Sequence, residues 1–276
     1  MLRPLTLALA QTNPELGNLE GNLSNILKLI EEAGRKGADF VVFPELALTG
    51  YNQELLGDKL LELALNLEDK PMKDLNEAAC DSGLYVAVGF IEKRTIPGVI
   101  FNSIALFSPE SLPPVSVAKV HLFTAEKLHF RAGSELKTFK IKHGTVGLFI
   151  CMDIGYPEAS RILALQGAEL LIAPSCWIRE DEDLWELHLR ARALDNLLFV
   201  AGCNRAGVEG NLSYIGQSMM VDPRGHVISR LKRDDEDKLL VTKIDLDEVP
   251  KARRRALHWL GRRPELYGPV SDVRVD

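Results

Sequence analysis

An internal repeat constrains the fold of this chain more than any other feature of the sequence. Three segments of the first half resemble three segments of the second half, in the same order along the chain. The matching pairs are residues 37–45 (GADFVVFPE) with 167–175 (GAELLIAPS), 85–94 (YVAVGFIEKR) with 198–207 (LFVAGCNRAG), and 101–110 (FNSIALFSPE) with 215–224 (IGQSMMVDPR). Self-similarity in a fixed order is typical of duplicated architecture. We infer two copies of a strand–helix–strand–strand unit.

The apolar patterning of each copy indicates helices that cover sheets. Ile26, Leu29, Ile30 and Ala33 recur at the spacing with which a helix buries one face. Runs such as FVVF and VGLFI are apolar throughout, as strands covered on both faces are. Two such units most naturally bury their sheets against each other. The expected fold is α/β, a four-layer α–β–β–α sandwich with an internal pseudo-two-fold duplication. It forms a single domain over residues 1–276, with a C-terminal arm at 250–276.

The composition disfavours several functional classes. The chain has 276 residues and a formal net charge of −6, and its one basic cluster, at residues 253–263, fits a solvated or subunit-contacting tail better than a nucleic-acid site. No apolar run approaches the ~20 residues of a membrane span. The four cysteines form no CxxC pair, and the six histidines show no metal-ligand spacing. A cytoplasmic protein with free thiols, no metal site, and no nucleic-acid or membrane partner is therefore expected.

Three reactive side chains stand where predicted strands end. Glu45 follows FVVF and Pro44, Lys119 follows VSVA, and Cys151 follows VGLFI. Each alone has an ordinary explanation, as a capping glutamate, a surface lysine or a core thiol. Ligand sites of α/β sheets, however, lie beyond the carboxyl ends of strands. In the second copy Ser175 occupies the position of Glu45, so the repeat carries an asymmetric set of reactive groups. One site shared by the two halves would have this distribution.

The surroundings of Cys151 favour a reactive thiol over an inert one. The segment GLFICMDIGYPE breaks a strand at the cysteine, and Pro157 with Glu158 begins the next helix. Backbone N–H groups at such a turn favour negative charge, which lowers the pKa of a thiol. Lys119 would add a positive charge and Glu45 would accept the thiol proton. These residues can perform nucleophilic catalysis without a histidine.

The same residues lie in three motifs that resemble the signature motifs of the nitrilase (carbon–nitrogen hydrolase) superfamily. The motifs are residues 44–51 (PELALTGY), 119–123 (KVHLF) and 151–158 (CMDIGYPE), and they occur in the order of the family. The resemblance extends from the first strand to the RRPELYG segment near the C-terminus. It implies the sandwich fold inferred above and catalysis without a metal or organic cofactor. It also implies self-association as a homodimer or a higher homo-oligomer.

The resemblance also implies roles for individual residues. Glu45 would be the general base, Lys119 the charge that stabilises the tetrahedral intermediate, and Cys151 the nucleophile. Glu126 matches a second glutamate that many members place beside this triad to orient substrate and lysine. The backbone N–H of Met152 would join Lys119 in the oxyanion hole. The implied reaction hydrolyses an amide to a carboxylic acid and ammonia through a thioester acyl-enzyme.

Substrate choice is the point at which this sequence departs from the commonest family pattern. Gly155 and Tyr156 replace an arginine and a phenylalanine of that pattern, which disfavours a substrate with a second carboxylate. Arg179 could compensate, or it could be a solvated surface charge. Met152 follows the nucleophile where dedicated nitrilases carry tryptophan. Tyr51, Met152 and Trp177 are the residues expected to contact substrate. The alternative for Trp177 is a rim aromatic that packs on Tyr51 or on a partner subunit.

The function that these features favour is an amidase for small or medium-sized uncharged amides. N-carbamoyl compounds are the closest enzymatic alternative, and nitriles come next. Two alternatives belong to other classes: a non-catalytic binding or scaffold member of the same fold, and a metal-dependent hydrolase that uses scattered histidine and aspartate residues. The complete Glu–Lys–Cys set disfavours the first, and resistance to chelators would exclude the second.

Overall fold

Two six-stranded sheets form the framework of the protein. The computed structural model describes residues 2–233 and 236–273. In spatial order, the first sheet contains β14 (Lys238–Asp245), β1 (Pro4–Gln11), β2 (Phe40–Val42), β3 (Tyr85–Lys93), β4 (Ile100–Phe107) and β5 (Val115–Ala118). The second contains β13 (Val227–Arg230), β12 (Met219–Val221), β9 (Phe199–Asn204), β8 (Leu170–Ser175), β7 (Gly144–Leu148) and β6 (Thr138–Ile141). β10 (Val208–Glu209) and β11 (Leu212–Ser213) form a separate short hairpin.

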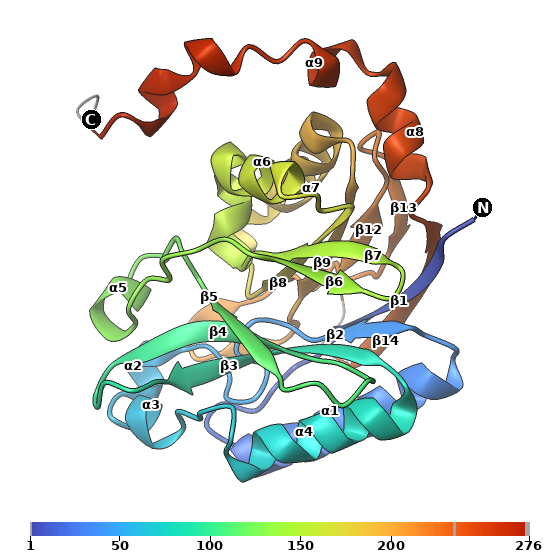
Figure 1. The fold of residues 1–276 in the computed structure, drawn as a ribbon. Helices are drawn as coiled ribbons and strands as arrows, with labels where there is room; N and C mark the ends of the chain where they lie inside the picture. Colours follow the sequence, from blue (N-terminus) through green and yellow to red (C-terminus); the bar gives the residue numbers. More distant parts are fainter. Residues whose placement is uncertain (1, 234–235, 274–276) are drawn as a thin grey trace.

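Helices cover the outer face of each sheet, which makes four layers (Figure 1). The first sheet is covered by α1 (Leu19–Arg35) and α4 (Lys70–Ser82), and the second by α6 (Pro157–Leu165) and α7 (Glu182–Asn196). Between the sheets, Leu7 and Phe40 of the first share one apolar cluster with Leu148 and Ile172 of the second. The predicted four-layer α–β–β–α sandwich is confirmed.

Local sequence signals explain where the main helices begin and which face they bury. The side chain of Asn18 caps α1 by accepting a hydrogen bond from the N–H of Gly21, and the predicted apolar stripe of this helix is buried. Pro157 occupies the first turn of α6, where its missing N–H costs nothing.

None of the helices in the described ranges is long and apolar enough to span a membrane. Shorter helical segments lie in the loops: α2 (Gln53–Leu56), α3 (Lys59–Glu62), α5 (Glu126–His129), and the 3₁₀ helices η1 (Cys151–Gly155) and η2 (Arg179–Asp181).

The two sheets repeat one connectivity, as the internal repeat predicts. β1, β2 and β3 are parallel neighbours and β4 follows antiparallel, and β7, β8, β9 and β12 are arranged in the same way. Each repeated unit is longer than predicted, because β1 precedes the unit of the first half and β7 precedes the unit of the second half. The strand pairing shows that one of the three matched segment pairs, residues 85–94 with 198–207, must be shifted by one residue. Tyr85 pairs with Phe40 and Phe199 pairs with Leu170, so Tyr85 corresponds to Phe199 and not to Leu198. Because successive side chains point to opposite faces of a strand, this shift changes which residues correspond on each face.

The chain beyond the sandwich forms an extended arm. The predicted arm, residues 250–276, begins inside α8 (Glu248–Arg255) and continues through α9 (Leu257–Leu260), η3 (Pro264–Leu266) and η4 (Gly268–Ser271). Arg253 anchors its base by donating to the carbonyl oxygens of Ala168 and Asn196, and its guanidinium lies 4.6 Å over the ring of Trp259. Figure 1 shows the arm, in red, reaching past the body of the molecule. Large apolar side chains are exposed along it: Leu257, Leu260, Leu266, Val270 and Val273.

Candidate active site

Two of the three predicted reactive residues, Glu45 and Lys119, form a direct ion pair, and a second carboxylate, that of Glu126, completes the group. Nζ of Lys119, directly after β5, lies 2.7 Å from Oε1 of Glu45, which follows β2. On its other side the same ammonium lies 2.8 Å from Oε1 of Glu126, the first residue of α5. All three side chains are fully buried. An ammonium held between two carboxylates in a buried site keeps its positive charge.

Glu45 is held by close packing of its turn and by strands of both sheets. The turn after β2 crosses β3 at Gly89, where a Cβ atom would lie only 2.3 Å from the nitrogen of Leu46. Only glycine permits this approach. One carboxylate oxygen of Glu45 accepts from Nδ2 of Asn102 in β4 at 2.7 Å, and the other accepts from the N–H of Cys176 after β8 at 2.9 Å. The orientation of this carboxylate therefore depends on both halves of the repeat.

Cys151 begins a sharp turn directly beyond β7. Its φ angle is +46°, in the left-handed region that non-glycine residues rarely adopt. Such a conformation costs ~1–3 kcal/mol and persists only where the surrounding structure holds it. Here Asp153 accepts from the N–H of Ile150 at 2.9 Å and from the N–H of His121 at 2.8 Å. The turn at the cysteine is thus tied to the loop that follows Lys119.

The Cys151 thiol is buried and protonated at rest. Burial raises its pKa well above the usual value, and the negative charge of Glu45 raises it further, while the charge of Lys119 and the N–H of Cys176 oppose this shift. The sulfur therefore lies within the electrostatic influence of both Glu45 and Lys119. The prediction that the strand-to-helix turn lowers the thiol pKa is wrong. Loss of hydration and two nearby carboxylates outweigh one ammonium and one N–H group, so removing the proton needs a base.

Glu45 has the properties of such a base. Burial raises the pKa of this carboxyl group, although the ammonium of Lys119 lowers it. For Lys119, burial lowers the pKa, but the charges of Glu126 and Glu45 raise it, and the net shift is well upward. A carboxylate with a raised proton affinity, next to a lysine that stays cationic, suits proton transfer from a thiol.

Tyr51 contacts Glu126 and is not among the residues that line the cavity at Cys151. Its hydroxyl donates to Oε1 of Glu126 at 2.7 Å, and the N–H of Phe123 donates to Oε2 of the same carboxylate at 2.8 Å. Burial raises the pKa of Tyr51 well above its usual value, and the charge of Glu126 adds to this, so the hydroxyl stays a donor. The structure therefore places Tyr51 where it can orient Glu126, and its contact with substrate stays a prediction.

A small cavity of about 30 Å³ adjoins Cys151. Met152 and Trp177, both predicted to contact substrate, line it, together with Phe123, Cys176, Ile178 and Asp181. The ring of Trp177 packs against Trp185 and His188, so α7 supports this wall from behind.

Arg179 is exposed at the start of η2 and does not line the cavity. A Cβ atom at Gly155 would lie 3.8 Å from Cε of Met152, in ordinary van der Waals contact. The ring of Tyr156 stacks on His121 with 3.7 Å between centroids.

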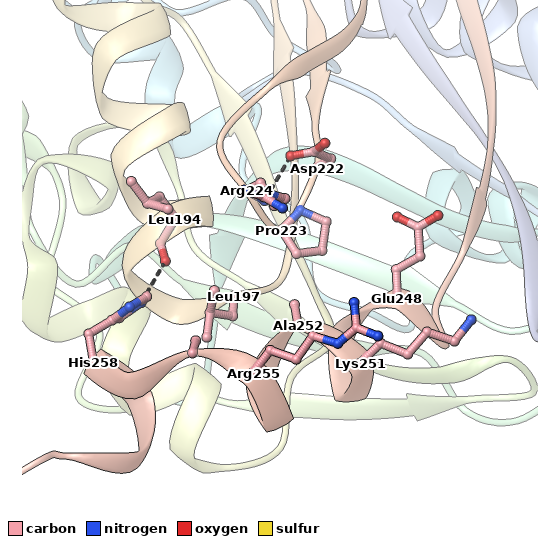
Figure 2. Close-up of a pocket in the computed structure, with 11 residues that line it drawn as sticks. Leu194, Leu197, Asp222, Pro223, Arg224, Glu248, Lys251, Ala252, Arg255 and His258 are labelled. Carbon is pink, nitrogen blue, oxygen red and sulfur yellow. Dashed lines mark hydrogen bonds between the residues drawn. The ribbon is translucent and has the colours of Figure 1, made fainter.

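A larger cavity of about 410 Å³ lies at the base of the C-terminal arm (Figure 2). It is lined by the end of α7, the turn at residues 222–224 and side chains of α8 and α9, and it contains none of the predicted site residues. The small cavity at the thiol is therefore the candidate active site. Across residues 2–233 and 236–273, no group of three or more His, Cys, Asp or Glu side chains is arranged to hold a metal ion.

Three groups that shape the site were missed from the sequence. Asn102 is a polar residue in a strand that is buried along its whole length, and that contrast was an available signal. Asp153 lies two residues after the nucleophile, inside the third motif. The Cys176 N–H has no side-chain signal at all, because every residue except proline carries this group.

Comparisons with known proteins show the family of this chain and agree with its fold. Residues 6–254 match the model of a family described as carbon-nitrogen hydrolase. A nitrilase of Pyrococcus abyssi is 33% identical, over 94% of this chain and 98% of its own length. An (R)-stereoselective amidase of a Pseudomonas species is 33% identical, over 93% of this chain and 90% of its own length. The crystal structure of a carbon-nitrogen hydrolase from Helicobacter pylori has a TM-score of 0.90 and 26% identity, with 98% of this chain and 99% of that chain covered.

Proposed function

Because this chain belongs to the carbon–nitrogen hydrolase family, we propose that it is a cysteine-dependent amidase. It converts an amide to a carboxylic acid and ammonia through a thioester acyl-enzyme. The observation that carries the proposal is the Lys119 ammonium, held between Glu45 and Glu126 in a buried site beside the Cys151 thiol. The (R)-stereoselective amidase named above supports this choice within the family.

The first half of the reaction forms the acyl-enzyme. Glu45 takes the proton of the Cys151 thiol as the sulfur attacks the amide carbon. Lys119 stabilises the negative charge that develops on the amide oxygen, and the N–H of Met152 is the second donor. The C–N bond then breaks, and Glu45 gives its proton to the leaving nitrogen, which departs as ammonia.

The second half regenerates the thiol. A water molecule attacks the thioester carbon, and Glu45 takes a proton from it. The C–S bond breaks, the carboxylic acid leaves, and the proton passes from Glu45 back to the sulfur of Cys151. One glutamate therefore serves both steps, as base and then as acid in each.

The pH dependence of activity tests Glu45 as the base. Activity requires the unprotonated carboxylate, and burial raises its pKa, so activity should be lost as the pH falls through a value above that of an exposed glutamate. We expect the acid limb of the kcat/KM profile to lie on the high side of the usual glutamate pKa. An acid limb at or below that value would contradict this assignment.

The cavity favours a small acyl group without a negative charge. Its volume is only about 30 Å³, so a compact group alone fits without movement of the walls. Among the described residues that line it, Asp181 is the one acidic side chain, and none is lysine or arginine. A second carboxylate on the substrate would meet repulsion and no guanidinium to bind it.

Ammonia release from matched substrates tests the amidase proposal. Butyramide and succinamate have the same chain length, but succinamate ends in a carboxylate. We expect kcat/KM for butyramide to exceed that for succinamate at least ~10-fold, because the wall holds Asp181 and no cation. The Cys151→Ala variant is the control for contaminating activity. A preference for succinamate would contradict the proposed substrate class, and the absence of turnover with any amide would contradict the amidase itself.

Two other reactions of the same chemistry stay open as alternatives. The nitrilase among the relatives supports hydrolysis of nitriles, in which the thiol attacks the nitrile carbon, and N-carbamoyl compounds carry the same terminal amide. Including butyronitrile and N-carbamoylalanine in the panel separates these cases. A non-catalytic scaffold would leave every compound unchanged. The cytoplasmic location stays a prediction, which the unpaired state of all four cysteines favours.

We propose that the protein is a homodimer or a higher homo-oligomer. The arm after α8 exposes Leu257 at 83% and Val270 at 65% of their surface, and exposed apolar groups of this kind mark association sites. Size-exclusion chromatography with light scattering should give a mass of at least two chains of 30.6 kDa. A monomer at working concentration would contradict this expectation.

A further inference from the structure

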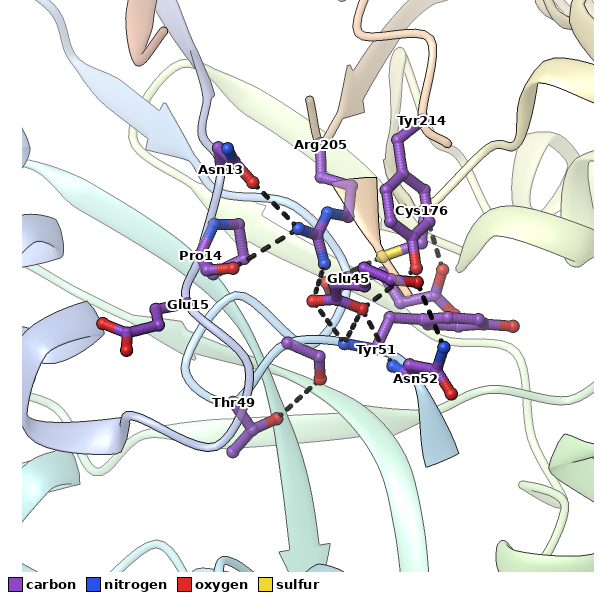
Figure 3. Close-up of polar contacts among 12 residues, drawn as sticks. Asn13, Pro14, Glu15, Glu45, Thr49, Tyr51, Asn52, Cys176, Arg205 and Tyr214 are labelled. Atoms are coloured by element: carbon purple, nitrogen blue, oxygen red, sulfur yellow. Dashed lines mark hydrogen bonds and ion pairs between the residues drawn. The ribbon is translucent and has the colours of Figure 1, made fainter. Parts of the chain in front are cut away.

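A buried ion pair between Arg205 and Glu209 lies next to Tyr51 and Asn52. Figure 3 shows Arg205 with Asn13, Tyr51, Asn52 and Tyr214 around it. The Arg205 side chain is fully buried and that of Glu209 is nearly so. Nη2 of Arg205 also donates to Oδ1 of Asn13 at 3.1 Å, and the guanidinium lies 4.1 Å over the Tyr214 ring. The reaction steps proposed above use none of these groups, and none of them lines the cavity at the thiol.

The contacts described for the Glu209 carboxylate are all with hydrogen-bond donors. It accepts from the N–H of Tyr51 at 3.0 Å, from the N–H of Asn52 at 2.9 Å and from the hydroxyl of Tyr214 at 3.0 Å. The guanidinium of Arg205 is the fourth donor. An ionised carboxylate suits this position because it only accepts, whereas an amide of the same shape would direct its own N–H groups at these donors.

The backbone at residues 50–52 is shaped around this carboxylate. Gly50 has a φ of +78°, and a Cβ at this position would lie only 2.5 Å from Oε1 of Glu209. Two successive N–H groups are therefore bound to Glu209 at the point from which the Tyr51 side chain leaves the backbone. The Tyr51 hydroxyl reaches Oε1 of Glu126 at 2.7 Å, and that oxygen lies 2.8 Å from Nζ of Lys119. Contacts run without a gap from the ion pair to the lysine.

We propose that the Arg205–Glu209 ion pair is a positioning element for Lys119 that acts through Tyr51 and Glu126. The inference rests on the proposed amidase function and adds a second layer of residues to its site. Burying two charges costs hydration that apolar side chains of similar volume would not lose. A carboxylate that binds two backbone N–H groups fixes the direction of the Tyr51 hydroxyl, and a fixed donor of this kind keeps the charge at Lys119 in place for the transition state.

The test compares Glu209→Gln, Tyr51→Phe and the double variant with the wild type in the full chain. Glu92→Gln is the matched control, because Glu92 is also buried, pairs with Arg94 at 2.8 Å and accepts from the hydroxyls of Ser103 and Ser116. Ser103 follows Asn102 in β4, so this second carboxylate lies on the face of the strand opposite to the site. The measurements are kcat and KM for butyramide and the Tm of each variant.

We expect Glu209→Gln to lower kcat about 10- to 100-fold, with KM changed less than ~3-fold, because a small displacement of a positioned charge acts mainly on the transition state. Glu92→Gln should leave both constants unchanged, even if its Tm falls. The double variant should be no slower than the slower single variant, because both changes break one chain of contacts. Multiplied effects in the double variant, or an equal loss of kcat in Glu92→Gln, would overturn the proposal.

A milder variant keeps the test decisive if Glu209→Gln does not fold. Tyr214→Phe removes one donor to Glu209 and keeps the ring under Arg205. It should lower kcat about 3- to 10-fold, again without adding to the effect of Tyr51→Phe. An unchanged kcat in Tyr214→Phe would overturn the proposal.

The pH profile of Cys151 alkylation by iodoacetamide separates this inference from the proposed function. The profile needs no substrate, and it depends on the charges beside the thiol. We expect Glu209→Gln and Tyr51→Phe to shift it in the same direction and Glu92→Gln to leave it unchanged. A wild type that hydrolyses no amide would refute the amidase function alone, whereas an unshifted profile in Glu209→Gln would refute the positioning role.

Discussion

Replacing Cys151 by alanine should lower kcat at least ~10⁴-fold and leave the fold intact, because Cys151 is the residue proposed to form the thioester. The hydrogen bonds of Lys119 to Glu45 and to Glu126 do not involve the sulfur. The charged part of the site should therefore keep its arrangement in the variant. The loss would then measure the nucleophile and not a collapsed pocket.

Cys203→Ala is the matched control for this variant. Cys203 is equally a buried thiol, but its sulfur lies near the carbonyl oxygens of Ala10 and Val42 and not near the site. Ammonia release should persist in Cys203→Ala and vanish in Cys151→Ala, with similar circular dichroism for both. Iodoacetamide should label one thiol of the wild type far faster than the other three, and that fast reaction should be missing from Cys151→Ala. Full activity in the Cys151 variant would refute the mechanism.

Lys119→Met should impair both activity and stability. The variant loses the charge proposed to stabilise the intermediate, and losing one such donor typically costs ~10²–10³-fold in kcat. It also leaves the carboxylates of Glu45 and Glu126 buried without a cation, which costs about 3–5 kcal/mol of the free energy of unfolding. Burial raises the pKa of the Glu45 carboxyl group, so this group can take up a proton as the pH falls, and the stability deficit should be smaller at pH 5 than at pH 8.

Urea unfolding at the two pH values, together with ammonia release, measures both effects of this substitution. Lys127→Met is the control, since Lys127 is an exposed residue of α5, one position after Glu126. Adding Glu126→Gln to Lys119→Met removes one of the two buried carboxylates that lack a cation. The double variant should recover part of the free energy of unfolding without recovering activity. A Lys119→Met variant as stable as Lys127→Met at pH 8 would show that the ammonium does not neutralise the two carboxylates.

The sequence by itself determined the architecture and the reactive groups. Helix and strand periodicity are properties of short segments, so the repeat of these segments was enough to predict two covered sheets. Glu45, Lys119 and Cys151 were found because each follows an apolar run, and the ends of such strands are where α/β folds place their sites. The proline that begins α6 marked the turn at the nucleophile in the same local way.

Only the tertiary structure decided the state and the support of those groups. The Cys151 thiol is protonated, against the prediction from its turn, because its pKa depends on lost hydration and on carboxylates that come from other strands. The N–H that holds Glu45 belongs to Cys176, 131 positions away, and the carboxylate that binds the N–H of Tyr51 belongs to Glu209, 158 positions away. Hydration and charge–charge distances depend on residues that are far apart in the chain, so local sequence patterns do not predict the pKa shifts that they cause.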